Sequence, residues 1–248
     1  MNTNITDKDR EFLKTYDVSQ YDRPSVTVDI LIFTVDIKHG LKLLLIKRKH
    51  PPFQGCQAVP GGFVNMDESL DEAAARELAE ETGIRGLHME QLYTFGSVNR
   101  DPRTRVISVT YFALVPSDKL NLVAADDAAE AGWFDVALDG EELKFTQDVE
   151  LAFDHEEIIR LAIERLQGKL SYTDIALNLV KDKRRFSIYE LQKINEAILN
   201  KELDPANFRR SFIMNYVNKG LARDTGEPCR EYSARASKYY SITSPDEA

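Results

Sequence analysis

One stretch of the chain, residues 62–84, constrains the fold more than any other. Ser69 and Glu72 form an S-x-x-E capping box, which predicts the start of a helix. Apolar residues recur every four positions behind the box, so one helix face is expected to point into a core. Gly83 is typical of a helix end, because glycine adopts the left-handed conformation at little cost. The sequence therefore predicts one well-defined amphipathic helix between these caps.

The same helix concentrates acidic side chains. Glu77, Glu80 and Glu81 stand at i, i+3 and i+4, a spacing that collects them on one narrow face. The like charges repel one another, and a hard divalent cation would remove that cost because it prefers oxygen ligands. Glu68 occupies the position where an apolar residue is expected before the cap, and adds a fourth carboxylate. The alternative is an ordinary solvated acidic face, although Arg76 is the one cation within the helix.

This stretch resembles the signature of the Nudix hydrolases, G-x5-E-x7-R-E-U-x-E-E-x-G-U, where U is aliphatic. All fixed positions are matched, by Gly62, Glu68, Arg76, Glu77, Leu78, Glu80, Glu81, Gly83 and Ile84. The resemblance implies an α/β fold, specifically an αβα sandwich with a mixed sheet. It also implies Mg²⁺- or Mn²⁺-dependent cleavage of a nucleoside diphosphate that is linked to another group.

The resemblance implies roles for individual side chains as well. Glu77, Glu80 and Glu81 are expected to be catalytic metal ligands, and Glu68 an auxiliary ligand. Arg76 is expected to orient a carboxylate through a bidentate pair. The general base stays open between Glu80 and another nearby carboxylate, because Nudix proteins place it differently.

Arg100, Arg103 and Arg105 lie on a proline-bearing loop between two predicted strands, residues 89–97 and 106–115. Guanidinium groups pair with phosphate oxygens in a bidentate manner, which suits a substrate clamp, but a solvated hairpin tip has the same composition. The loop sequence R-D-P-R-x-R-V resembles that of Nudix proteins that handle ADP-ribose. This resemblance implies that the three arginines bind substrate, and that ADP-ribose is cleaved to AMP and ribose 5-phosphate.

Alternating apolar residues predict two further strands, at residues 25–35 and 41–47. A helix is expected over residues 153–168, where Asp154 and Glu157 are placed as a second capping box. These elements and the acidic helix make up a predicted first domain, residues 1–168. Residues 169–185 show no clear period and are expected to connect it to a second domain, residues 186–248.

The second domain begins with two capped helices joined by a short turn. Ser187 and Glu190 form a third box, and Asp204 precedes Pro205 at the first position of the next helix. Residues 221–224 and 239–243 are expected to pair as a hairpin after the helices. The order of helix, helix and basic hairpin predicts a winged helix. Its sequence resembles the C-terminal domain of Nudix-related transcriptional regulators.

The winged helix predicts duplex DNA as a partner. The second of its helices is expected to enter the major groove, with the wing on phosphates. The residues predicted to contact DNA are Asn207, Arg209 and Arg210 on the helix, and Arg230, Arg235 and Lys238 on the wing. One such module is too small for high specificity, so a homodimer on a palindromic site is expected.

The charge of the chain is unevenly shared, which supports different partners for its two parts. Residues 181–248 carry 13 Lys and Arg against 10 Asp and Glu, a net of +3, whereas residues 1–180 carry 19 against 31, a net of −12. No apolar run approaches the length of a membrane span. Two cysteines without metal-ligand spacing indicate a reducing compartment, and the cytoplasm is expected.

Three functions follow from these patterns. The first is a Nudix pyrophosphatase, favoured because its metal motif is the most specific signal. The alternative is a DNA-binding transcriptional regulator that uses the Nudix domain as a sensor of ADP-ribose or a sugar, and one chain can do both. A third is a scaffold whose C-terminal domain only mediates dimerisation.

Overall fold

The computed structural model describes residues 5–116, 118, 131–231 and 237–243. Within these residues the first part of the chain forms one sheet in the order β5-β6-β1-β2-β7-β8, with β3 beside β2 and β4 beside β1. The strands are β1 (Ser25–Asp36), β2 (Gly40–Lys47), β3 (Gln57–Ala58), β4 (Gly61–Phe63), β5 (Glu90–Phe95), β6 (Val106–Leu114), β7 (Ala131–Asp139) and β8 (Glu142–Phe145). β1 and β6 run parallel and the other pairs are antiparallel, so the sheet is mixed.

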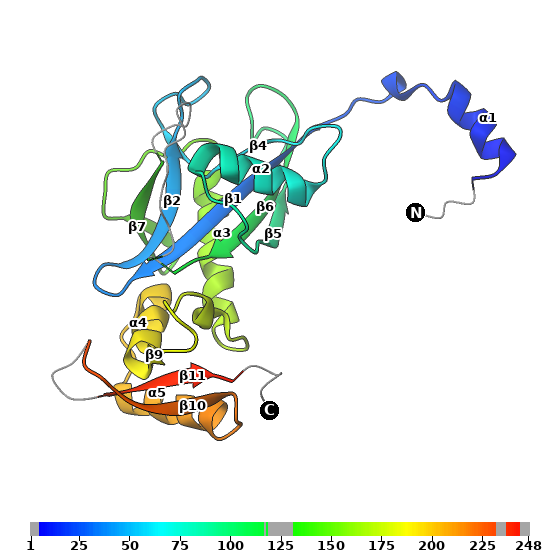
Figure 1. Cartoon of the computed structure of the whole chain (residues 1–248). Coiled ribbons are helices and arrows are strands. Elements are labelled where there is room, and N and C mark those ends of the chain that lie inside the picture. The colour runs from blue at the N-terminus through cyan, green and yellow to red at the C-terminus, as the bar shows by residue number, and fades with distance from the viewer. Residues whose placement is uncertain (1–4, 117, 119–130, 232–236, 244–248) are drawn as a thin grey trace.

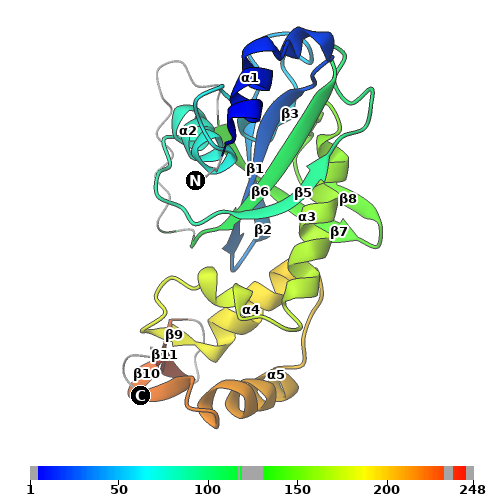
Figure 2. The ribbon, with the colours of Figure 1, turned by 90° about the vertical axis from the view of Figure 1, so that its right-hand side faces the viewer.

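Two helices cover opposite faces of this sheet, α2 (Leu70–Thr82) and α3 (His155–Lys169) (Figure 2). Successive side chains of a strand point to opposite faces, and β1 is buried on both. Ile30 and Ile32 pack with α2, whereas Leu31 and Phe33 pack with α3. The predicted αβα sandwich and mixed sheet are therefore confirmed.

The predicted start and end of α2 are confirmed. The Ser69 hydroxyl accepts from the Glu72 backbone N–H, and the Glu72 carboxylate accepts from the Ser69 N–H. Gly83 has a left-handed φ of 73° and donates its N–H to the Ala79 carbonyl. Each of these contacts joins residues within four positions, so the local sequence is sufficient to place the helix.

The capping box predicted at Asp154 and Glu157 is wrong. Asp154 is the residue before α3, but its side chain makes no cap hydrogen bond. Both of its carboxylate oxygens accept instead from Arg100, on the loop before β6. A charge-assisted bidentate pair is stronger than a neutral backbone cap, which explains the outcome.

The C-terminal part of the chain folds as the predicted winged helix. Helices α4 (Ile188–Leu199) and α5 (Pro205–Phe212) precede a hairpin of β10 (Ala222–Cys229) and β11 (Ser237–Ile242). A short strand β9 (Phe186–Ser187), which the sequence did not indicate, pairs with β11. A π-helical turn, η4 (Ile213–Val217), continues α5. Asp204 caps α5 as predicted, with Pro205 at its first turn.

Part of the segment expected as a connection, residues 169–185, is packed into the core, although residues 171–174, 178 and 181–185 are exposed. It contains a 3₁₀ turn, η3 (Ile175–Asn178), and Ile175, Leu177 and Val180 are buried. These side chains belong to a hydrophobic cluster that also includes residues of α3 and α4. The two parts of the chain therefore share a core at their junction.

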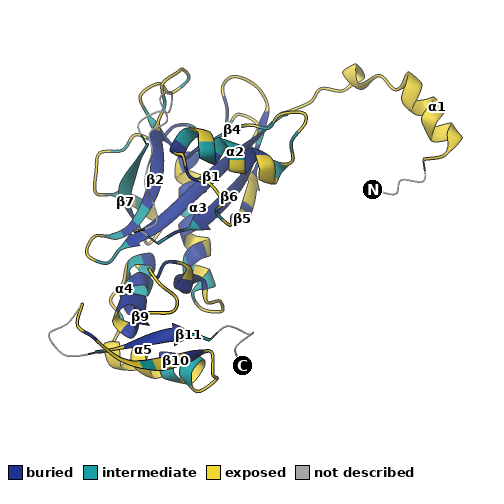
Figure 3. Ribbon diagram, viewed as in Figure 1, coloured by how far each residue is buried: buried dark blue, intermediate teal, exposed yellow. Residues whose placement is uncertain are grey.

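The N-terminal residues form an arm that projects from the body (Figure 1). The arm contains α1 (Asp7–Thr15) and a 3₁₀ turn, η1 (Val18–Gln20), with no buried side chain in either. Figure 3 shows α1 exposed along its whole length.

Candidate functional site

Arg76 is the centre of a polar cluster at the exposed side of α2. Its guanidinium donates from Nε and Nη2 to the two oxygens of Glu68, at 2.9 and 2.6 Å. Its Nη1 donates to Glu77 at 2.7 Å and to Glu80 at 3.2 Å, and Nη2 also donates to the Phe63 carbonyl. The expected bidentate pair is thus present in the structure, and Glu68 is the carboxylate that it orients.

The environment of Glu68 favours its charged form. Hydrogen bonds from Arg76 and then from the Asn65 backbone N–H lower the pKa of Glu68 to about 2. The same contacts raise the pKa of Arg76. The pair therefore stays ionised at any physiological pH and holds the loop before α2 against the helix.

Glu81 lies apart from the Arg76 cluster and is more deeply buried. Its carboxylate accepts from the Gly61 N–H at 2.7 Å. Burial raises the pKa of Glu81 to about 8, and the nearby charges of Glu77 and Asp29 act in the same direction. Burial likewise raises the pKa of Glu77. A cation placed between such carboxylates would lower their shared electrostatic cost.

Gly61 and Gly62 allow the backbone of β4 to approach these groups closely. A Cβ at Gly62 would lie 2.2 Å from a carboxylate oxygen of Glu77, and a Cβ at Gly61 would lie 2.2 Å from the Val28 carbonyl. Any side chain at either position would therefore displace β1 or the Glu77 carboxylate. The two glycines keep open the space into which the acidic face of α2 points.

The three glutamates on this face of α2 have different hydrogen-bond partners. Arg76 binds Glu77 and Glu80, whereas Glu81 turns toward Gly61. Across the described part of the chain, no three His, Cys, Asp or Glu side chains form a group that could hold a metal ion as they stand. The assignment of the metal ligands therefore stays a prediction.

Beside Glu81 lies a cavity of about 170 Å³, which we call the α2 cavity. It is lined by residues of the central strands, the loop before β6 and the start of α3, together with β4. The lining residues are Thr27, Asp29, Ile46, Arg48, Ala58, Val59, Gly61, Gly62, Phe63, Glu81, Arg100, Asp101, Arg103, Val106, Phe153 and His155. It thus joins a carboxylate of the predicted metal site to two arginines of the predicted clamp.

The three predicted clamp arginines have different surroundings. Arg100 is almost fully buried and forms the pair with Asp154, with Asp29 at 3.6 Å. Arg103 is partly exposed and forms a bidentate pair with Asp101. Both line the α2 cavity, whereas Arg105 is not among its lining residues and donates to the backbone carbonyls of Ser97 and Val106.

Two aromatic rings and two guanidinium groups are stacked at this cavity. Arg48 lies 4.7 Å from the centre of the Phe153 ring, and Arg103 lies 5.6 Å from the same ring and 5.2 Å from that of Phe63. Burial lowers the pKa of Arg48, and the charge of Arg103 adds to the effect. The sequence analysis missed Arg48, Phe63 and Phe153, because only the fold brings them together.

His155 is a structural residue of the cavity wall. It is fully buried, and its Nδ1 accepts from the Val59 N–H at 3.1 Å. Burial lowers the pKa of His155, so the ring is neutral and serves as an acceptor. Its position at the start of α3 fits this role better than proton transfer.

The residues predicted to meet DNA are exposed where the structure describes them. Asn207, Arg209 and Arg210 lie on α5, and Arg230 follows β10. Lys238 on β11 forms an ion pair with Asp224 across the hairpin. Arg235 lies outside the described residues.

Comparison with known proteins identifies the class of protein. Residues 23–161 match the NUDIX domain model, and residues 183–242 match that of the NrtR DNA-binding winged helix domain. The chain belongs to the Nudix family and carries a C-terminal winged-helix domain.

Individual relatives match either the whole chain or its first part. The chain is 37% identical to the ADPR responsive transcriptional repressor NtrR of Acinetobacter baylyi, over 84% of this chain and 80% of the relative. It is 40% identical to the ADP-ribose pyrophosphatase of Methanocaldococcus jannaschii, over 61% of this chain and 82% of the relative. The crystal structure of Shewanella oneidensis NrtR complexed with a 27mer DNA is similar, with a TM-score of 0.69 and 30% identity over 88% of this chain and 93% of that one.

Each helix in the described residues is too short or too polar to span a lipid bilayer.

Proposed function

We propose that this protein is a Mg²⁺- or Mn²⁺-dependent pyrophosphatase that cleaves ADP-ribose to AMP and ribose 5-phosphate. The proposal rests mainly on one observation. The acidic helix, with its complete Nudix signature, borders a cavity that two arginines line. The name of the Methanocaldococcus relative, an ADP-ribose pyrophosphatase, supports the same substrate.

The side chains fit a hard divalent cation. Glu77, Glu80 and Glu81 would hold it, with Glu68 as an auxiliary ligand, because they offer clustered carboxylate oxygens. Burial raises the pKa values of Glu77 and Glu81, and nearby carboxylates add to the effect, so a cation bound beside them would stabilise their charged forms. A bound cation would neutralise the diphosphate and activate a water molecule for attack on phosphorus.

The remaining side chains would bind and orient the substrate. Arg76 holds Glu68 and Glu77 in fixed orientations through its five-donor fork. Arg103 is the arginine that a phosphate can reach, because it is partly exposed at the cavity. A phosphate oxygen would replace the Asp101 carboxylate as its partner. Phe153 and Phe63 offer ring faces to a base or a ribose at the same opening.

Hydrolysis of ADP-ribose with Mg²⁺ tests the activity, and Glu81→Gln tests the site. Glu81 and its glutamine substitute have nearly the same shape, and both can accept from the Gly61 N–H, so the fold should survive. Loss of one catalytic carboxylate is expected to lower kcat at least about 100-fold, which corresponds to about 2.7 kcal/mol of transition-state stabilisation. Glu72→Gln, in the capping box, is the control and should stay within about twofold. Equal turnover in the wild type and Glu81→Gln would refute the assignment.

We also propose that the protein is a homodimeric regulator that binds duplex DNA through its winged helix, in the cytoplasm. The winged helix itself and the full-length similarity to a transcriptional repressor support this function. Asn207, Arg209 and Arg210 on α5 would lie in the major groove, with Arg230, Arg235 and Lys238 at phosphates. Two free cysteines, Cys56 and Cys229, fit a reducing compartment.

A gel-shift titration tests DNA binding. The duplexes are the region upstream of the protein's own gene, the regions upstream of neighbouring NAD- or sugar-metabolism genes, and a random sequence of equal length. Arg209→Ala/Arg210→Ala should abolish the preference for the specific duplex, because base contacts are worth about 1–3 kcal/mol each. Lys201→Ala, an exposed change outside α5 and the wing, is the control. Equal affinity of the wild type for all duplexes would leave the winged helix as an interaction module.

A further inference from the structure

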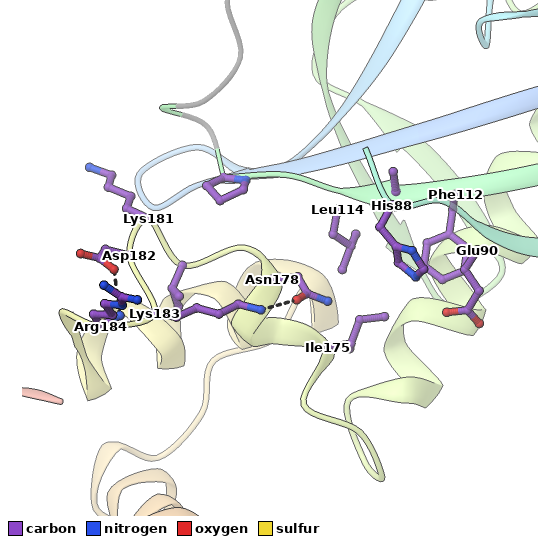
Figure 4. Close-up of a pocket in the computed structure, with 13 residues that line it drawn as sticks. His88, Glu90, Phe112, Leu114, Ile175, Asn178, Lys181, Asp182, Lys183 and Arg184 are labelled. Atoms are coloured by element: carbon purple, nitrogen blue, oxygen red, sulfur yellow. Dashed lines mark hydrogen bonds between the residues drawn. The ribbon is translucent and has the colours of Figure 1, made fainter. Parts of the chain in front are cut away.

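A second cavity, which shares no lining residue with the α2 cavity, lies where the Nudix domain meets residues 175–184 (Figure 4). We call it the junction cavity. Its volume is about 450 Å³, compared with about 170 Å³ for the α2 cavity. Cavities of this size are typical of small-molecule sites. Its lining residues are His88, Glu90, Phe112, Ala113, Leu114, Pro116, Ile175, Asn178, Val180, Lys181, Asp182, Lys183 and Arg184.

One wall of the junction cavity is apolar. Phe112 and Ala113 of β6 are buried, as are Ile175 and Val180 from the segment opposite. Leu114 lies between the two sides (Figure 4). Such a surface suits the planar or apolar part of a ligand, because burial of apolar area is favourable in proportion to the area.

The other wall is basic. Lys181, Lys183 and Arg184 lie within four residues, and all three are exposed. The Lys183 ammonium donates to the Asn178 side-chain oxygen at 2.8 Å, and Figure 4 shows this side chain directed across the cavity. The Lys183 ammonium, although exposed, is therefore held beside another residue of the lining.

The two acidic residues of the lining offset only part of this positive charge. Glu90 forms an ion pair with Lys169, a residue outside the lining. Asp182 accepts from the Arg184 backbone N–H at 2.8 Å, which shapes the turn that carries the cations. Among the lining residues three cations thus stand with two carboxylates, while the Glu190 carboxylate outside the lining interacts with Lys181 and leaves Lys183 and Arg184 as the cations of interest.

The backbone that carries the cations is held from both sides. The Lys181 N–H donates to the buried Glu190 carboxylate, and the Lys183 carbonyl accepts from the Ile242 N–H at 2.9 Å. Preorganised donors lose less entropy when a ligand binds. The basic wall is therefore part of the folded junction and is ordered before any ligand arrives.

We propose that the junction cavity binds a small phosphate-bearing ligand of nucleotide size. The apolar wall takes its planar part, and Lys183 and Arg184 take its phosphate. A DNA duplex is the other anion to consider, but it is far too wide for this cavity. A bound ligand touches β6 on one side and the segment attached to β11 on the other, so it bridges the two domains.

The four histidines of the chain provide the test. His88 lines the junction cavity and His155 lines the α2 cavity, whereas His50 lines neither. The histidine ring resonances are followed by ¹H–¹³C NMR while AMP is added to the whole protein in EDTA, and they are assigned by single His→Gln substitutions. Without metal or turnover, the result does not depend on the proposed hydrolysis.

A saturable shift of the His88 resonance with AMP is expected, and a much weaker one with adenosine. Lys183→Ala/Arg184→Ala should weaken the AMP affinity at this resonance at least about tenfold, whereas Arg103→Ala, in the α2 cavity, should leave it unchanged. Lys201→Ala is the matched surface control. Lys183→Gln/Arg184→Gln, which removes both charges but keeps polar side chains, provides a second variant pair and should weaken the AMP affinity in the same way.

Three results would overturn the proposal. A shift of His155 alone would place AMP only in the α2 cavity. If adenosine shifts the His88 resonance as much as AMP does, or if the double substitution leaves the AMP affinity unchanged, the basic wall does not bind the phosphate. Loss of duplex DNA binding in the double variant without any His88 response to AMP would assign these cations to DNA.

Discussion

Single residues of similar sequence context differ in what the fold allows them to do. Arg103 and Arg105 are two positions apart and were both predicted to bind substrate. Arg103 lines the α2 cavity and stacks near two aromatic rings. Arg105 is committed to two backbone carbonyls. The structure therefore supports a substrate contact for the first of them.

The pair gives a matched kinetic prediction. Arg103→Ala should raise KM for ADP-ribose at least about tenfold and lower kcat less, as expected when uniform binding is lost. Arg105→Ala should change KM by less than about threefold, because its guanidinium is used within its own loop. Steady-state kinetics with Mg²⁺ measures both. Equal effects of the two substitutions, or better hydrolysis of a nucleoside triphosphate, would contradict the proposed clamp.

Glu190 is a buried carboxylate at the junction of the domains, and its pKa is raised by burial above the usual 4.5. Its contribution to stability is fully present below pH 4.5 and is lost as the pH rises through the higher folded value. Glu190→Gln keeps an acceptor for the Lys181 N–H and has no charge to desolvate. The variant should therefore be more stable than the wild type at pH 8, with a smaller difference at pH 5.

Urea unfolding at a series of pH values measures this difference. Glu202→Gln, at an exposed position, is the control and should show no such pH dependence. A Glu190→Gln variant that is less stable than the wild type at every pH would show that the hydrogen bonds of Glu190 outweigh its desolvation.

At the scale of elements, α3 connects the two parts of the molecule (Figure 2). Its first residue, His155, lines the α2 cavity. Near its end, Gln167 donates to the Ile198 carbonyl of α4, and Lys169 binds Glu90 of β5. The Arg100–Asp154 pair fixes the start of this helix to the loop before β6.

One ion pair at the start of α3 is buried and another, within α3, is exposed. Their contributions to the free energy of unfolding should therefore differ. Asp154→Ala leaves the buried Arg100 with only the more distant Asp29 carboxylate, at 3.6 Å, and should lower the free energy of unfolding by about 3 kcal/mol, the lower end expected for breaking a buried pair. Glu164→Ala removes an exposed i, i+4 pair with Arg160 and should cost less than about 0.5 kcal/mol. Urea unfolding followed by circular dichroism gives both values. Similar costs would mean that the buried pair does not hold the helix.

At the scale of the whole molecule, the uneven distribution of charge determines which part can approach DNA. The acidic first part, at −12, repels a DNA duplex, so only the part at +3 is suited to approach it. In a homodimer two wings reach the duplex together, and each phosphate contact releases counterions. The salt dependence of binding therefore reports the number of chains on the DNA.

Lys238→Ala should lower the steepness of log affinity against log salt by about 2 in a dimer, since each phosphate contact contributes about 0.9. Fluorescence anisotropy between 50 and 200 mM salt measures the slope, with Lys201→Ala as the control. Sedimentation should show twice the chain mass of 28.2 kDa. A slope change near 1 together with the mass of a single chain would exclude the dimer.

The sequence by itself determined the parts of this protein that depend on near neighbours. The caps of α2 and α5 each join residues three or four positions apart, so they were predictable from Ser69, Glu72, Asp204 and Pro205. The alternation along β1 likewise indicated a buried strand. Hydrogen bonds of this kind need only the local sequence, and they form where no stronger tertiary contact takes the capping side chain.

Only the tertiary structure decided contacts between distant residues. Arg100 takes the Asp154 carboxylate that would otherwise cap α3, and the Gly61 N–H binds the Glu81 carboxylate 20 positions away. Arg48 and Phe153, more than 100 positions apart, meet at the α2 cavity. In each case a local preference competes with a buried, charge-assisted or aromatic contact that exists only once the chain is packed, and the stronger contact prevails.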